Sequence, residues 1–227
     1  MREKILVIAA HPDDEVLGCG ATIAKKILKE KAVVNTLIMS KGILSRENIK
    51  NKKKDLIKNI KMAQVANKLI GVKKLQILDF PDNEFDSVPI LNLIKEIEIK
   101  IKSFLPDTIY THFHGDLNID HQMVARAVLT ACRPINKNCV SKIFAFEVLS
   151  STDYNYGIPE TFVPNHFECI NKTINLKLKA LKKYNHEMKT SPHSRSYENV
   201  LNLAKLRGSQ MFENFAESFM MTRSFSR

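Results

Sequence analysis

Apolar and polar residues follow two different periods between residues 5 and 146. Short continuous apolar runs, with charged or turn residues at their ends, are typical of buried parallel strands. Longer segments carry apolar residues every three to four positions, as an amphipathic helix does; Leu17, Ala21, Ala24 and Leu28 form one such stripe. These patterns predict strands over residues 5–10, 32–39, 75–79, 108–111 and 141–146, and helices over residues 16–31, 53–69, 88–104 and 121–132.

The alternation of strand and helix predicts an α/β fold with a mostly parallel sheet. Strands separated by helices of this length pair through right-handed crossovers, which places helices on both faces of the sheet. Residues 151–164 are rich in turn residues, and no repeat or linker separates them from the rest. We therefore expect a single domain over residues 1–227 with a C-terminal subregion over 151–227. This subregion is predicted to hold an edge strand and two helices, over residues 167–170, 172–189 and 197–207.

The composition is that of an ordinary globular protein, because 44% of the 227 residues are hydrophobic and 26% are charged. This balance excludes a disordered chain, a collagen-like chain and a small disulfide scaffold. Cys19, Cys132, Cys139 and Cys169 contain no Cys-x-x-Cys pair, and we expect them to be reduced and mostly buried. No segment reaches the roughly 18 apolar residues of a membrane span, so we expect a cytoplasmic protein without a transmembrane segment.

The charge is strongly positive, with 35 Lys and Arg against 24 Asp and Glu and a formal net charge of +11. Such an excess suits nucleic acid, an anionic membrane surface or a phosphorylated small molecule as partner. We expect no nucleic-acid partner, because no motif combines aromatic and basic residues for base stacking. Peripheral membrane contact stays open, as do the oligomeric state and the alternative that the lysines only solvate helix faces.

Two polar clusters follow predicted strands. Residues 11–15 read His-Pro-Asp-Asp-Glu after the first strand, and residues 112–121 hold three histidines and two aspartates after the fourth. Ligands of open α/β sheets bind beyond the carboxyl ends of the strands, so we expect both clusters at one edge. Imidazoles and carboxylates from two places in the chain are the composition of a mononuclear zinc site, which in catalytic form has three protein ligands and a water.

Each cluster also has a structural interpretation. Asp13 and Asp14 are residue types that cap a helix or complement its dipole in the first turn. Asp120 could cap the helix that begins at His121 in the same way. Two such clusters, each pairing His with Asp after a strand, favour a shared metal site over two separate caps. Gly18-Cys19-Gly20 is only a fragment of a dinucleotide-binding fingerprint, and we interpret it as close packing of helix on sheet.

The motif Ala10-His11-Pro12-Asp13-Asp14-Glu15 resembles the signature of the PIG-L (LmbE-like) zinc-dependent de-N-acetylase family. The segment Asp116-Leu117-Asn118-Ile119-Asp120-His121 resembles the later Asp-His motif of the family. The first motif is highly specific and the second moderately so. Less specific similarities extend over most of the chain, at Ser40-Lys41-Gly42 with Ser45-Arg46, at residues 192–196, at Arg207-Gly208 and at residues 216–219.

The resemblance implies a Rossmann-like α/β fold and hydrolysis of an N-acetyl group on an amino sugar. By position, His11, Asp14 and His121 match the zinc ligands of the family, and Asp13 matches its general base. Sites of this composition also accept Fe²⁺, Mn²⁺ or Co²⁺. For Asp120 two interpretations stay equal: it orients a ligand imidazole, or it caps the helix.

One position departs from the family pattern. Many members carry a second His three residues before the metal-binding one, and here that residue is Asn118. An amide can donate a hydrogen bond to an oxyanion but cannot supply a proton. Either Asp13 performs both proton transfers, or another residue such as His114 or His193 helps.

Substrate contacts are expected from Arg46 and Arg195, each of which follows a Ser in a predicted loop, and from His193. A guanidinium can bind phosphate or sugar hydroxyls in bidentate fashion; an exposed or ion-paired Arg is the alternative. The expected activity is removal of acetyl from a nucleotide-, lipid- or glycan-linked acetamido sugar. The alternatives are hydrolysis of another N-acyl amide, such as an antibiotic or thiol precursor, and a non-catalytic basic nucleotide-binding module.

Overall fold

The computed structural model of the chain describes residues 2–42, 52–135, 139–157 and 160–226. Within these residues the centre is a seven-stranded sheet, in which β1 to β5 are parallel and β7 is antiparallel to both of its neighbours. The order across the sheet is β3-β2-β1-β4-β5-β7-β6. The strands are β1 (Lys4–Ala9), β2 (Val33–Ser40), β3 (Lys74–Phe80), β4 (Thr108–His112), β5 (Lys142–Phe146), β6 (His166–Cys169) and β7 (Ala216–Ser224).

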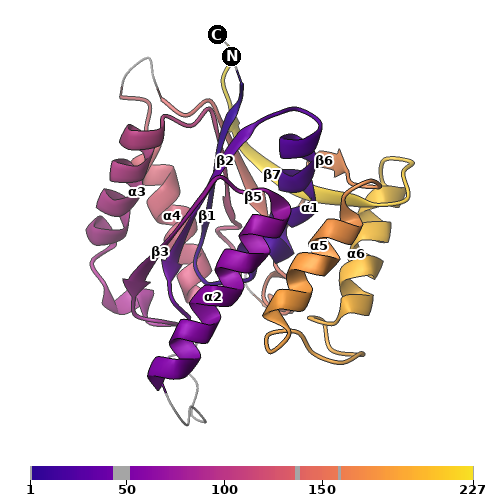
Figure 1. Ribbon diagram of the computed structural model, residues 1–227. Helices are drawn as coiled ribbons and strands as arrows, with labels where there is room; N and C mark the ends of the chain where they lie inside the picture. Colours follow the sequence, from indigo (N-terminus) through magenta and orange to yellow (C-terminus); the bar gives the residue numbers. More distant parts are fainter. Residues whose placement is uncertain (1, 43–51, 136–138, 158–159, 227) are drawn as a thin grey trace.

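Helices lie on both sides of this sheet (Figure 1). On one face α1 and α2 pack, with α5 against them, and on the other face α3 and α4 pack together. The α-helices are α1 (Asp14–Leu28), α2 (Lys52–Ile70), α3 (Ile90–Phe104), α4 (Ile119–Ala131), α5 (Ile174–Leu181) and α6 (Tyr197–Ser209). Single turns of 3₁₀ helix lie at η1 (Phe85–Ser87), η2 (Thr152–Tyr154) and η3 (Lys182–Tyr184).

The sheet divides the hydrophobic core into two layers. Successive side chains of a strand point to opposite faces, and β1 is buried on both from its second residue, Ile5, onward. Ile5 and Val7 join the core on the α1 side, whereas Leu6 and Ile8 join the core against α3 and α4. The continuous apolar run at residues 5–10 is therefore explained by a central strand that is covered twice.

Gly18 brings α1 close to the sheet. A Cβ at this position would overlap the ring of Phe146 on β5, so only glycine allows the helix to approach so near. The approach agrees with our interpretation of the Gly18-Cys19-Gly20 segment as helix-on-sheet packing. It also brings the N-terminus of α1, where the polar cluster lies, close to the ends of β1 and β4.

The predicted α/β domain with a mostly parallel sheet is confirmed, and one detail of the C-terminal subregion is corrected. The helix predicted over residues 172–189 is too long, because α5 stops at Leu181 and η3 then carries Tyr184 inward to full burial. The segment 212–221 is core only over residues 216–219: Phe219 lies in β7 with none of its surface exposed, whereas Phe212 is fully exposed. Of the helices in the described parts of the chain, none is long and apolar enough to cross a membrane.

Candidate metal centre

Three of the predicted ligands meet at the carboxyl ends of β1 and β4. His11 and Asp14 follow β1, and His121 lies in the first turn of α4, which follows β4. Asp14 Oδ2 is 3.3 Å from His11 Nδ1 and 3.2 Å from His121 Nε2. Ligand atoms from all three residues lie within 4.8 Å of one another. Since zinc binds nitrogen and oxygen at about 2.0–2.2 Å, one ion can contact all three residues.

The second nitrogen of each imidazole faces a buried carboxylate. His11 Nε2 is 2.8 Å from Asp120 Oδ2, and His121 Nδ1 is 3.3 Å from Asp116 Oδ1. Ser151 donates a short hydrogen bond to Asp116 and so holds that carboxylate in place. Carboxylate–imidazole pairs of this kind fix the tautomer of metal-ligating histidines. Two imidazoles and a carboxylate, with both rings oriented in this way, therefore fit a catalytic divalent-metal site.

The cap of α4 is Asn118 and not Asp120. Asn118 Oδ1 accepts from the backbone N–H of Asp120 at 2.8 Å and of His121 at 3.4 Å. The Asp120 carboxylate instead accepts from the N–H groups of Asn83 and Phe85, at 2.8 and 2.9 Å, and contacts His11. Of the two interpretations of Asp120, the geometry supports the one in which it orients an imidazole.

The charges of the three candidate ligands depend on one another. Burial lowers the pKa of His11 and His121, but hydrogen bonds and charges of Asp120, Asp14 and Asp116 outweigh it and raise these pKa values to about 10 and about 9. Burial raises the pKa of Asp14, yet the two neighbouring imidazoles hold it well below its usual range. A divalent cation at this point would replace protons, because metal ligands must be deprotonated.

Asp13 lies beside the three candidate ligands in an unusual backbone conformation. Its φ is 112°, in the left-handed region that non-glycine residues rarely adopt, and its side chain makes no helix cap. The residue is 2% exposed, and its Oδ2 is 3.0 Å from Arg195 Nη1. Burial raises the pKa of Asp13 well above its usual range, and the Arg195 charge opposes that effect. The alternative interpretation of Asp13 as a side-chain cap is not observed.

The Glu15 side chain holds the backbone of Asp13 in place by a hydrogen bond. Its Oε2 accepts from the Asp13 N–H at 3.0 Å, and its Oε1 accepts from Asn67 at 2.8 Å and from the Tyr184 hydroxyl at 2.7 Å. Burial raises the pKa of Glu15 to about 7, although the Tyr184 hydrogen bond lowers it. Through this carboxylate α1, α2 and η3 together fix the left-handed turn.

Arg195 is held from three directions. Its Nε donates to Ser150 Oγ at 2.9 Å while Nη1 reaches Asp13, and the preceding Ser194 donates to Asp153 and accepts from the Ser150 N–H. The loop after β5 thus positions the guanidinium against the carboxylate. Arg195 was predicted to contact substrate, and the structure places it in the candidate site beside Asp13.

The remaining predicted residues lie at different distances from this centre. Asn118 lines the cavity, and its amide donates to Asn83 Oδ1 at 3.0 Å. His193 is exposed, and its Nδ1 accepts from the Arg195 N–H at 3.0 Å. His114, considered as a second proton donor, faces Glu160 at 3.5 Å and does not line the cavity. Arg46 lies outside the described residues.

Several cavity residues were not predicted. They come from the ends of β3 and β5, from α2 and from the segment after η3, and they are Asn59, Asp82, Asn83, Ser150, Ser151 and Glu187. Asp82 and Asn83 follow β3 and Ser150 follows β5, so the rule that sites form beyond strand ends would have found them. Nothing in the local sequence marks Glu187, which is brought in by the fold alone.

His112 is also part of the centre but is not a ligand. Its Nε2 accepts from the Ala10 N–H at 2.9 Å, and its ring stacks on His121 with a centroid separation of 3.8 Å. Burial, together with the neighbouring His121 charge, holds the pKa of His112 well below its usual range. A neutral ring is required for it to accept that N–H, so His112 fixes the β1 end against α4.

The sequence was compared with protein families. A model of the family described as "PIG-L: GlcNAc-PI de-N-acetylase" matches residues 6–132, more than half of the chain. The "uncharacterized deacetylase YaiS" of Escherichia coli K12 is 29% identical over 190 residues, 81% of this chain and 91% of its own. The "probable N-acetyl-alpha-D-glucosaminyl L-malate deacetylase 2" of Bacillus cereus is 28% identical over 167 residues, 70% and 74% of the two chains.

The fold was also compared with solved structures. The N,N'-diacetylchitobiose deacetylase of Pyrococcus horikoshii, solved with its inhibitor MPG, superposes with a TM-score of 0.78 at 21% identity. The match covers 97% of this chain and 84% of that one. The architecture described above is therefore shared along almost the whole chain, C-terminal subregion included.

Proposed function

Because the chain belongs to the GlcNAc-PI de-N-acetylase (PIG-L) family, we propose that it removes the acetyl group of an acetamido sugar. Members of this family are deacetylases, and this chain is likewise a metal-dependent amide hydrolase. The observation that supports the proposal most is the buried carboxylate of Asp13, paired with Arg195 and lying beside a His-Asp-His cluster whose imidazoles are both oriented by carboxylates. This arrangement combines a place for a cation with a base next to it.

We assign the metal to His11, Asp14 and His121. The ion we propose is Zn²⁺; Fe²⁺ is the alternative that the same donors accept. When bound, the ion would supply Lewis acidity, which polarises the acetamide carbonyl and makes a water molecule more acidic. Asp120 and Asp116 keep the two imidazoles turned toward it, so replacing either carboxylate would weaken metal binding.

Asp13 moves the proton. It accepts a proton from the attacking water, whose oxygen adds to the acetyl carbon, and returns the proton to the nitrogen as the carbon–nitrogen bond breaks. Acetate and the free amine of the sugar are the products. Burial raises the pKa of Asp13, and this direction suits the return of the proton.

Arg195 supplies the positive charge that the missing family histidine would have supplied. Asn118 is already committed as the cap of α4 and as a donor to Asn83. The guanidinium of Arg195, 3.0 Å from Asp13, is a permanent cation in the same cavity and stabilises the negative charge that develops on the carbonyl oxygen. Arg46 and His193 remain proposed substrate contacts.

The lining of the cavity supports a sugar over an apolar amide. Carboxylates, amides and hydroxyls dominate it, among them Asn59, Asp82, Ser150 and Glu187. Such groups give orientation to a ligand rich in hydroxyls. Relatives in sequence and in fold are named for an acetylglucosaminyl malate and for diacetylchitobiose, both of which carry acetamido sugars.

The test pairs metal analysis with acetate release. Purified protein is assayed for bound metal and then offered acetamido sugars, their nucleotide, lipid and glycan conjugates, and N-acetyl amino acids as matched non-sugar amides. We expect one divalent ion per chain and acetate from at least one sugar. Turnover of the non-sugar amides alone would show that the substrate class is wrong, and protein that takes up no added Zn²⁺ or Fe²⁺ would contradict the metal assignment.

A further inference from the structure

One face of the molecule concentrates the positive charge. The outward side of α2 contains five lysines, three aliphatic residues and one glutamine, and no acidic residue. At 3.6 residues per turn these positions fall in a single arc of about 160°. They are Lys53, Lys54, Ile57, Lys58, Lys61, Gln64, Val65, Lys68 and Leu69. Asp55, the acidic residue of α2, is half-buried and lies outside the arc.

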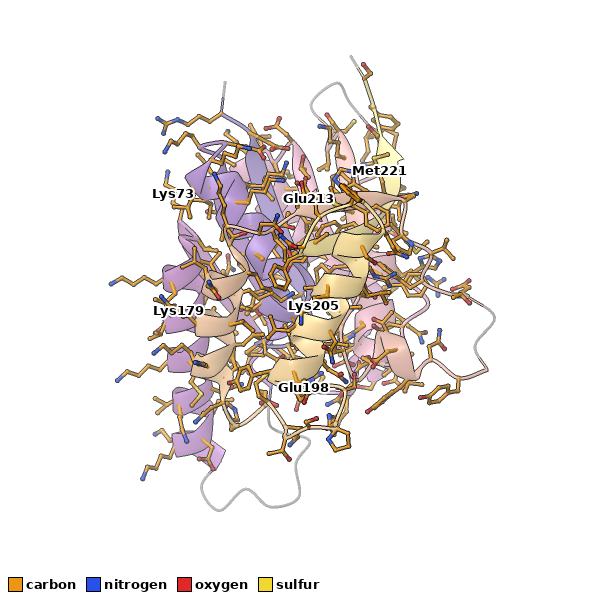
Figure 2. The ribbon with its side chains drawn as sticks, turned by 90° about the vertical axis from the view of Figure 1, so that its right-hand side faces the viewer. Lys73, Lys179, Glu198, Lys205, Glu213 and Met221 are labelled. Carbon is orange, nitrogen blue, oxygen red and sulfur yellow. The ribbon has the colours of Figure 1, made fainter. Side chains whose placement is uncertain are left out.

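The neighbouring segment extends this face. α2 packs against both α5 and η3, and the exposed lysines of those elements are Lys179, Lys182 and Lys183. In Figure 2, Lys179 lies on α5 next to α2, and long side chains with nitrogen tips project from the same edge of the molecule. We call the outward arc of α2 together with these three lysines the basic face.

The aliphatic members of the basic face are well exposed. Ile57 is 59% exposed, Leu69 40% and Val65 38%, and all three share the outward arc with the five lysines. Clustered lysines on a helix attract anionic lipid headgroups, and exposed aliphatic side chains among them can enter the boundary between headgroups and acyl chains. A nucleic-acid site would instead be expected to offer arginines or stacking aromatic rings, and the outward arc of α2 contains neither.

The basic face borders the mouth of the candidate site. Asn59, on the buried side of α2, lines the cavity, and the exposed Lys58 is its neighbour in sequence. Glu187, which follows Lys182 and Lys183 by a few residues in the chain, also lines the cavity. A flat surface held against α2 and η3 would thus lie next to the cavity.

From these observations we propose that the basic face of α2, α5 and η3 docks the enzyme on an anionic lipid bilayer. Lysines contact the negatively charged headgroups, and Ile57, Val65 and Leu69 enter the boundary between headgroups and acyl chains. The proposal does not depend on which acetamide the enzyme hydrolyses.

Helix α3, on the opposite face of the sheet, provides matched controls. Lys95 and Lys102 are exposed and seven residues apart, as are Lys61 and Lys68 on α2. Ile99 is 59% exposed, like Ile57. Unlike the arc of α2, α3 includes the partly exposed Glu96 and Glu98 among these positions. The two helices therefore allow the same substitutions in two different charge environments.

The experiment is sedimentation of the full-length protein with phosphatidylcholine vesicles, with and without phosphatidylglycerol, at physiological ionic strength, where the Debye length is about 8 Å. We expect binding only to the anionic vesicles. Lys61→Glu with Lys68→Glu should weaken that binding at least about tenfold, since each lysine near an anionic surface contributes roughly fivefold. Lys95→Glu with Lys102→Glu, which changes the net charge equally, should change it less than about twofold.

The aliphatic substitutions distinguish a membrane from a soluble polyanion. Ile57→Asn should weaken vesicle binding several-fold, and Ile99→Asn should not. Three results would overturn the proposal: no preference for anionic vesicles, an equal loss in the α3 charge variant, or lysine-dependent binding that Ile57→Asn leaves intact. The last result would identify a polyanion site. Acetate release from a soluble acetamido sugar is measured in all variants and should be unchanged, so a failure of docking stays separate from a failure of the proposed reaction.

Discussion

Asp13 combines a left-handed backbone, almost complete burial and an ion pair with Arg195. A left-handed non-glycine residue costs about 1–3 kcal/mol, and such strain is tolerated where the surrounding structure fixes it. Here the Glu15 carboxylate and the guanidinium of Arg195 fix it from two sides. The strain aims the carboxylate into the cavity, away from the helix N-terminus that it would otherwise cap.

Replacing Asp13 by Asn should separate metal binding from turnover. The amide keeps the shape of the side chain but cannot accept a proton, so we expect kcat to fall by about 10²–10⁴, the usual contribution of a general base. Bound metal per chain should stay at the wild-type value, because His11, Asp14 and His121 are untouched. Wild-type turnover in this variant would remove Asp13 from the mechanism.

Glu15→Gln tests how far the position of Asp13 matters. Glu15 accepts three hydrogen bonds with two oxygens, and a glutamine can offer only one oxygen to those donors. A buried donor left unpaired lowers the free energy of unfolding by about 1–3 kcal/mol. We also expect kcat to fall, while KM and the metal content stay at the wild-type values.

Tyr184→Phe is the matched control for that variant. It removes one donor to Glu15 but keeps the bond from the Asp13 N–H, so kcat should fall much less than in Glu15→Gln. Equal losses of kcat in the two variants would mean that Glu15 acts only on overall stability. Urea denaturation and steady-state kinetics measure the two effects separately.

At the residue scale the sequence located the candidate centre but not its supports. His11, Asp14 and His121 could be predicted because two short motifs place them after strands whose ends share an edge. Asp116 could be predicted only as part of a motif, and no pattern marks Tyr184 or Glu187. Asp116 is held by Ser151 and Thr152, 35 and 36 residues further along the chain, and Tyr184 meets Glu15 across 169 residues. No local pattern encodes such contacts, nor the burial of Glu187 by the fold.

At the scale of elements, α1 is held by a buried ion pair whose two members both form hydrogen bonds with the α1 backbone. Lys177 of α5 donates to the Leu17 carbonyl and to Glu217 of β7, both at 2.6 Å. Glu217 in turn accepts from the N–H groups of Ala21 and Thr22, at 3.2 and 2.6 Å. Thus α5 and β7, both from the C-terminal subregion, bind the middle of α1, and the candidate base Asp13 lies at the N-terminus of the same helix.

Lys177→Met should therefore be costly. The substitution leaves the Glu217 charge buried without its cation, which should lower the free energy of unfolding by about 3–5 kcal/mol. Lys179→Met, on the exposed side of the same helix, should change stability by less than about 0.5 kcal/mol. Urea unfolding of the two variants makes the comparison, and similar midpoints would show that the pair does not stabilise α1.

Glu168 on β6 gives a pH-dependent contact between β6 and α1. Burial raises its pKa, but hydrogen bonds from His166 and Lys25 and the charge of Lys26 outweigh burial and hold the pKa of Glu168 well below its usual value of 4.5. A depressed pKa contributes stability that is present above the unfolded value and is lost as the pH falls toward the folded one. The window therefore lies below about pH 4.5.

Glu168→Gln measures that contribution. The difference in unfolding free energy between wild type and variant should be constant from neutral pH down to about pH 5 and should shrink at lower pH. Thermal or urea unfolding across that range provides the measurement. A difference that stays constant through pH 3 would contradict a depressed pKa.

Elements with strong periodicity were predicted well, and the failures have a physical reason. Four of the five parallel strands, β1, β2, β4 and β5, lie inside the sheet and are mostly buried, which makes them visible as apolar runs in the sequence, whereas β3 is an edge strand. β7 was not predicted as a strand, because its buried positions include Glu217 and Ser218, which are polar. Their burial is stabilised by Lys177 and by Glu147, partners that a single sequence does not reveal.

At the scale of the whole molecule, charge and chemistry are arranged around one edge. The candidate centre lies beyond the strand ends, and the basic face lies on α2, α5 and η3 beside it. The sum of +11 follows from composition, but its concentration on one face could be found only from the fold, because α2 and α5 are separated by a hundred residues.

The place of β7 in the sheet has a consequence for synthesis on the ribosome. β7 follows β6 in sequence but lies between β5 and β6, so β6 cannot join the sheet until β7 has been translated. Only then can Glu217 of β7 accept hydrogen bonds from the backbone of α1. Arg195, which pairs with Asp13, also belongs to this late part of the chain. A nascent chain can carry all three candidate metal ligands and still lack an ordered base. We therefore expect polypeptides released early by premature termination to release no acetate, even when they bind metal.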